Sequence, residues 1–277
     1  MERKHFLQSM EREIDFPKEY RKLEGLCNVH RTMSGAVYLT LNDFIRRYFW
    51  EWADRDNFIT FDELREHMGF PIEEKSGGKV NLLASDIDMN KYFLFCEMIM
   101  TLLTSLGVYL DEAFYAVKNV LFQTIESTIE KVGFECKQKG SEIQIVQKNA
   151  VALEVVELVP ELADVIVEYN HYILRGNIEK KRMLLKQIAD ALEPQRGVLR
   201  QVQKRNTADF FELINTMNIR HNNLDSSDKN NYNAKFDAMS LSEKEAWYDL
   251  IYGQALGLFV TLEQQERNKQ IDIYKQS

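Results

Sequence analysis

Apolar residues recur every three or four positions along most of this chain, a spacing that places them on one face of a helix. We therefore predict helices over the segments that carry this pattern: residues 17–52, 61–68, 86–106, 111–131, 160–175, 179–192, 194–219 and 243–262. Thr60-Phe61-Asp62-Glu63 and Ser242-Glu243-Lys244-Glu245 have the form of capping boxes, which predicts a helix start at each. The end of the chain, Gln264 to Ser277, is polar, which predicts fraying.

The pattern changes once, between the helix that ends near residue 131 and the helices that resume near residue 150. Residues 134–137 and 142–147 alternate apolar and polar positions around Lys139-Gly140, which predicts a β-hairpin over residues 134–147. An isolated hairpin is marginal in water, so it should lie against a helical surface. The expected fold class is mainly α, a multi-helix bundle with one β-hairpin.

The domain organisation is less sharply marked in the sequence. The polar stretch Glu73 to Lys79, which includes Gly77-Gly78, has the composition of a loop. We place a soft boundary there, between an N-terminal helical region (1–75) and a helical bundle that contains the hairpin (86–277). A single domain is the alternative.

Composition supports long helices, because 12 Gly and 4 Pro provide few turns for 277 residues. A hydrophobic fraction of 45% excludes wholesale disorder. The net charge of -8 argues against broad electrostatic capture of nucleic acid. A local cluster of Lys180, Lys181, Arg182 and Lys186 is either a stripe that faces phosphate or a solvated helix face.

Cysteine usage and hydropathy indicate the compartment. Cys27, Cys96 and Cys136 are far apart and odd in number, as expected for free thiols in a reducing environment. The run Tyr92 to Leu106 is interrupted by Glu97 and is short for a membrane span. We therefore expect a cytoplasmic protein without membrane association. The sequence contains no CxxC or HExxH spacing, so we expect no metal and no cofactor.

A group of polar residues follows the helix that ends near residue 219: Arg220, His221, Asn222 and Asn223. In a catalytic site, Arg220 would present a cationic fork to a phosphate and His221 would exchange protons near neutral pH. Asn222 and Asn223 would orient either group and contact a substrate. The alternative is structural: the amides and His221 cap the helix, and Arg220 pairs with an acidic neighbouring helix.

A second polar group, Tyr169, Asn170 and His171, lies near the end of another apolar helix. His171 would meet His221 across a helix pair and supply a second imidazole, while Tyr169 and Asn170 would bind substrate. The alternative is a satisfied buried network that fixes the register of the helices.

Four short segments carry a resemblance to a known family: Tyr169-Asn170-His171, Leu192-Glu193-Pro194, Ile219-Arg220-His221-Asn222-Asn223 and Glu245-Ala246-Trp247-Tyr248-Asp249. With them, residues 150–266 resemble bacterial HEPN-like helical proteins, including those of abortive infection and phage defence. Catalytic members are metal-independent ribonucleases whose motif is Arg, a polar residue, a short gap and His. Arg220 and His221 match its opening, whereas residues 224–228 contain no His.

The resemblance implies a HEPN-like C-terminal bundle that forms a homodimer, in which two copies of the polar motif face one cleft. The leading functional hypothesis is a defence or stress protein that binds RNA and cleaves it with Arg220, His221 and His171. The competing hypothesis is a non-catalytic interaction or regulatory module that pairs with another protein or with itself. The two differ on whether His171 and Arg220-His221 converge in one cleft.

Overall fold

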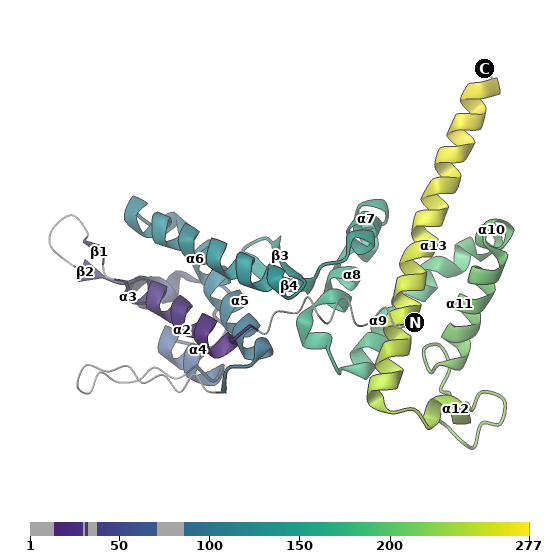
Figure 1. The fold of residues 1–277 in the computed structure, drawn as a ribbon, viewed down its shortest axis with the longest axis horizontal. Coiled ribbons are helices and arrows are strands. Elements are labelled where there is room, and N and C mark those ends of the chain that lie inside the picture. Colours follow the sequence, from purple (N-terminus) through teal and green to yellow (C-terminus); the bar gives the residue numbers. More distant parts are fainter. Residues whose placement is uncertain (1–13, 30, 33–37, 71–85, 277) are drawn as a thin grey trace. The chain divides into compact units, whose positions relative to one another are not determined.

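Figure 1 shows the protein as a computed structural model, which describes residues 14–29, 31–32, 38–70 and 86–276. The chain divides into two compact units, Met1–Gln147 and Lys148–Ser277. The division lies after the hairpin and not between residues 75 and 86, where we expected a boundary. The fold class agrees with the prediction, since the described residues are mainly helical and include the expected hairpin.

Helices account for most of the described residues of the first unit. It contains helices α2 (Phe16–Cys27), α3 (Leu41–Tyr48), α4 (Phe61–His67), α5 (Met89–Ser105) and α6 (Glu112–Lys131), short 3₁₀ turns at Phe49–Glu51 and Gly107–Tyr109, and strands β1 (Arg31–Thr32), β2 (Tyr38–Leu39), β3 (Phe134–Lys139) and β4 (Glu142–Gln147). The hairpin packs on α5 and α6, and both of these helices also pack on α2. The N-terminal helices and the hairpin therefore belong to one unit.

Strands β3 and β4 form the predicted antiparallel hairpin, with Phe134 paired to Gln147 at its open end. Side chains of α5 accept hydrogen bonds from backbone N–H groups on the outer edge of β4. The N–H of Ile143 donates to Thr101 Oγ1 (2.9 Å), and the N–H of Ile145 donates to Glu97 Oε1 (2.6 Å). These bonds explain why a glutamate interrupts the apolar run of α5, because an open strand edge would otherwise expose unpaired N–H groups.

The predicted continuous helix over residues 17–52 is wrong. Helix α2 ends at Cys27, and a two-residue antiparallel pairing of β1 with β2 precedes α3. Asn28 stops the helix: its Nδ2 donates to the carbonyl of Glu24 (3.0 Å), and its Oδ1 accepts from Asn42 (3.1 Å). Part of the predicted helix, residues 30 and 33–37, lies outside the described residues.

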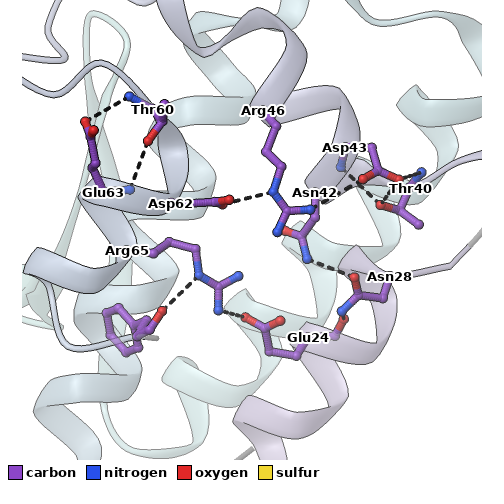
Figure 2. A network of polar contacts seen from close by, with 11 residues as sticks. Glu24, Asn28, Thr40, Asn42, Asp43, Arg46, Thr60, Asp62, Glu63 and Arg65 are labelled. Atoms are coloured by element: carbon purple, nitrogen blue, oxygen red, sulfur yellow. Dashed lines mark hydrogen bonds and ion pairs between the residues drawn. The ribbon is translucent and has the colours of Figure 1, made fainter. Parts of the chain in front are cut away.

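Polar contacts join α2, α3 and α4 (Figure 2), and the contact between α2 and α4 is buried. Arg65 of α4 is 2% exposed, and its Nη2 lies 2.7 Å from Glu24 Oε1 of α2. The guanidinium also donates through Nε to the carbonyl of Phe70 (3.2 Å). At the start of α4, Thr60 and Glu63 form the predicted capping box, which is confirmed.

The second unit is a helical bundle. It contains helices α7 (Ala150–Leu158), α8 (Ala163–Asn170), α9 (Ile178–Leu192), α10 (Arg196–Val202), α11 (Lys204–Thr216), α12 (Ala234–Asp237) and α13 (Leu241–Gln276), with 3₁₀ turns at Pro160–Leu162, Tyr172–Leu174 and Glu193–Gln195. Helix α13 packs against α7, α9, α10 and α11, so its first half forms the centre of the bundle. Residues from all these helices meet in one apolar core.

Helix α13 differs from the prediction at both ends. Its capping box uses Ser240 and Glu243, not Ser242 and Glu245: Ser240 N–H donates to Glu243 Oε2 (2.8 Å), and Glu243 N–H donates to Ser240 Oγ (3.3 Å). The helix also continues to Gln276, where we expected fraying. Its last buried residue is Thr261, and its final turns extend beyond the other helices of the unit (Figure 1).

Candidate functional site

Two reciprocal hydrogen bonds close the turn after α11. Asn218 has a φ of 58° and turns the chain sharply away from the helix. Its N–H donates to Asn223 Oδ1 (2.7 Å), and the N–H of Asn223 donates to Asn218 Oδ1 (3.1 Å). Asn223 is 2% exposed and also donates to the carbonyl of Asn231, while its own carbonyl accepts from the N–H of Asn233 (2.9 Å). Asn223 therefore links both ends of the loop 218–233.

Arg220 points to the end of α9, where it meets two carboxylates. Its Nη1 lies 2.8 Å from Glu193 Oε2, and its Nη2 lies 3.6 Å from Asp190 Oδ1. Arg196 also pairs with Glu193 (3.1 Å), and its guanidinium lies over the ring of Phe211. Burial alone would raise the pKa of Glu193, but hydrogen bonds from Arg220 and Arg196 outweigh it and the pKa is lowered.

His221 and Asn222 lie on the surface. His221 lines a polar pocket of about 420 Å³ together with Thr216, Asn223 and the segment 230–234. The pKa of nearby Asp228 is lowered, mainly by hydrogen bonds from Asn231 and the N–H of Asn230, with a smaller effect of His221. The Oδ1 of Asn222 accepts from the N–H of Leu224 (3.3 Å), a contact within the loop.

Tyr169 belongs to a network that joins α8, α9 and α13. Its hydroxyl donates to Asp249 Oδ1 (3.0 Å), and its ring stacks on Tyr252 at 4.0 Å between centroids. Burial, and then the charge of Asp249, raise the pKa of Tyr169. Asn170 donates to the Tyr252 hydroxyl (2.6 Å) and to the carbonyl of Ile166 (2.8 Å).

Lys181 lies at the centre of this network, whereas the sequence placed it only in the basic cluster of residues 180–186. Its side chain is 7% exposed, and Nζ lies 2.7 Å from Asp249 Oδ1 and 2.8 Å from Glu245 Oε1. Glu245 also accepts from the N–H of Gly176 (2.9 Å). Burial would raise the pKa of Glu245, but the bonds from Lys181 and Gly176 offset it, so the pKa is lowered. These partners are far apart in sequence, and no local pattern indicates them.

The other members of the basic cluster are also paired with carboxylates. Ion pairs join Lys180 to Glu168 (2.7 Å), Arg182 to Glu179 (3.0 Å) and Lys186 to Asp190 (2.7 Å). Opposite charges thus accompany the cations of this helix. This arrangement fits the solvated-face alternative better than a stripe that captures phosphate.

His171 has neighbours different from those of Arg220 and His221. Its Nδ1 accepts from the N–H of Ile173 (3.3 Å), and its ring stacks on Tyr172 at 4.7 Å. Arg220 instead meets Glu193, and His221 faces the loop 230–234. The contacts in the described part of the chain therefore give no sign that the three residues converge on one reacting atom.

A second pocket, of about 540 Å³, lies beside the loop 218–233, which contributes Asn218 and Leu224 to its lining. Phe236 and Tyr248, whose rings stack at 6.1 Å, contribute its apolar wall, and Lys244 and Arg175 contribute cations. None of the predicted site residues lines this pocket. Within the described residues, no group of three or more His, Cys, Asp or Glu side chains could hold a metal ion.

Comparisons of this chain with protein-family models, with curated proteins and with solved structures gave no match. Among the helices that the structure describes, none is long and apolar enough to cross a membrane.

Proposed function

We propose that this chain is a non-catalytic module that binds another protein, and that the Arg220 cluster stabilises its C-terminal unit. The Arg220 cluster comprises Arg220, His221, Asn222 and Asn223, and the observation that carries the proposal is that the fold itself engages two of them, Arg220 and Asn223. The fork of Arg220 holds Glu193 and Asp190, and the amide of Asn223 holds the loop 218–233. An arginine that stabilises charge on a phosphate must direct its donors at the reacting group.

Exposed apolar side chains on α13 support protein binding. Ile271, Ile273 and Tyr274 are 49%, 69% and 81% exposed on a segment of α13 that has no buried residue. A partner that covered these side chains would remove apolar surface from water. The net charge of -8 and the paired basic cluster give RNA binding less support.

A cleavage assay with Arg220→Ala and His221→Ala tests the first half of the proposal. Purified wild-type chain should release no product from labelled single-stranded RNA, with or without a chelator. Arg220→Ala should lower the melting temperature, because Glu193 and Asp190 each lose one of their two cationic partners. Arg205→Ala is the matched control, since the Arg205 side chain is 93% exposed and should leave the melt unchanged. Cleavage that either site variant abolishes at an unchanged melting temperature would instead assign catalysis to the cluster.

Native-size measurements on extracts of expressing cells test the second half. The chain should migrate in an assembly larger than its 32.6 kDa, whether the partner is another protein or a second copy. Replacing Ile271 and Tyr274 with Glu should release the chain from it, whereas Glu266→Gln, an exposed change on the same segment, should not. Migration of the wild-type chain as a free monomer would contradict the proposal.

A further inference from the structure

The exposed side of α13 carries a stripe with alternating steps of three and four residues. Its members are Leu250, Gly253, Gly257, Val260, Gln264, Arg267, Ile271 and Tyr274. This spacing is the heptad pattern by which two helices pack along a common seam. Leu250, Ile271 and Tyr274 are exposed, and Val260 is half-buried. The stripe therefore runs from the half of α13 inside the bundle to its far end.

Gly253 and Gly257 make the first half of the stripe shallow. Both are exposed within a helix, and a Cβ at either position would meet no atom within 4 Å. Because a Cβ would fit at both positions, no described residue of this unit requires glycine there. Alanine would also make the helix more stable than glycine does. Two glycines four residues apart on one face do allow another helix to approach closely.

The second half of the stripe is bulky where the first half is shallow. Residues 263–276 carry Arg267, Ile271 and Tyr274 on the seam, and this segment is roughly 20 Å long at 1.5 Å per residue. Residues 248–261 form the part of α13 inside the bundle and have the same number of residues. Each half therefore matches the other in length and complements it in side-chain size.

We propose, on the basis of the interaction-module function above, that the partner of α13 is a second copy of this chain. The two α13 helices pair antiparallel about a two-fold axis near residue 262. In this register Ile271 of one copy lies over Gly253 of the other, and Arg267 lies over Gly257. Residues 263–276 of each helix cover Gly253 and Gly257 of the other copy, and the Arg220 cluster contributes no residue to the seam.

Charge selects the antiparallel direction. In the antiparallel register, Lys275 of one copy faces Asp249 of the other at the edge of the seam. Asp249 already pairs with Lys181 of its own chain, but its side chain is 51% exposed and so accessible to a second cation. A parallel register would place Arg267 against Arg267 and leave glycine opposite glycine at position 253. Juxtaposed like charges in a helix seam are unfavourable, and the glycine layers would leave the seam unfilled.

A charge swap across the seam tests the register. Wild-type chain in analytical ultracentrifugation should form a dimer between about 1 and 100 μM. Gly257→Arg should weaken that dimer by about tenfold or more, because the new arginine faces Arg267 of the second copy. Adding Arg267→Glu should recover part of the lost affinity, since arginine then faces glutamate at both ends, whereas the space above position 257 stays filled by the new side chain. Glu266→Gln is the matched control: it also raises the net charge by one, by removing a negative charge on the side of α13 away from the seam.

Disulfide cross-linking provides a second measurement that does not depend on the charge variants. Cysteines placed at 253 and 271 are about 27 Å apart along one helix, so a disulfide between them must join two copies. Mass spectrometry should find this 253–271 disulfide, and not 253–253. A wild-type monomer throughout the concentration range overturns the self-pairing, although a different protein could still occupy α13. A dimer that the charge swap fails to restore even in part, or that yields no 253–271 disulfide, uses another surface and also overturns it.

Discussion

Replacing Asn223 with Ala tests whether the polar cluster holds the loop 218–233 together. The substitution leaves the N–H of Asn218 without its acceptor and the carbonyl of Asn231 without its donor. A buried polar group that loses its partner costs about 1–3 kcal/mol. Asn218 is buried and Asn231 is half-buried, so we expect a total loss of about 2–4 kcal/mol in the free energy of unfolding.

Urea denaturation followed by circular dichroism measures this loss, and hydrogen exchange should localise it to residues 148–276. The adjacent Asn222→Ala is the control: Asn222 is exposed, so its removal should change the free energy by less than about 0.5 kcal/mol. Asn218→Ala combined with Asn223→Ala should cost less than the sum of the single changes, because the two amides bond to each other's backbone. If Asn223→Ala were as mild as Asn222→Ala, the reasoning would be refuted.

Three further predictions concern ion pairs. Arg65→Met should destabilise the first unit by about 3–5 kcal/mol, and adding Glu24→Leu should recover most of the loss, as measured by urea denaturation. Because the pKa of Glu193 is lowered in the folded protein, its ionised carboxylate stabilises the fold fully above the unfolded pKa, and this stability is lost as the pH falls through the folded pKa. Between about pH 3 and 6, the melting temperature of Arg220→Ala should therefore fall less steeply with acid than that of the wild type. Lys181→Met should lower the free energy of unfolding by about 1.5–3 kcal/mol at neutral pH. If it lowered this free energy less than the same substitution of an exposed lysine, the buried network would be contradicted.

Several local features could be predicted because neighbouring residues decide them. The capping box of Thr60 and Glu63 depends on two side chains three positions apart. The hairpin turn depends on Gly140, whose φ of 62° favours glycine, and on the alternation on either side. The capping box of α13 was displaced by two positions, because Ser240 and Ser242 each have a glutamate three residues later. Local pattern could not choose between them.

The sequence identified polar residues that need partners, but it did not identify the partners. The sequence indicated that Arg220, Asn223 and Tyr169 are polar groups at the ends of apolar helices, which require partners when buried. It gave two alternatives for each and no means of choosing, because the partners come from other helices. Asp249, for example, is remote in sequence from Tyr169, yet their side chains lie 3.0 Å apart.

The sequence by itself thus determined most of the helices, the hairpin and the polar character of the cluster, since hydrophobic period and turn chemistry act between near neighbours. Tertiary structure alone decided where the chain divides into units and which stripe of α13 stays exposed. It also decided which carboxylates form ion pairs with Arg220 and Lys181. The physical reason is that burial and charge pairing depend on distance in space. Packing brings residues together that are remote in sequence, and it sets which face of a long helix still meets water.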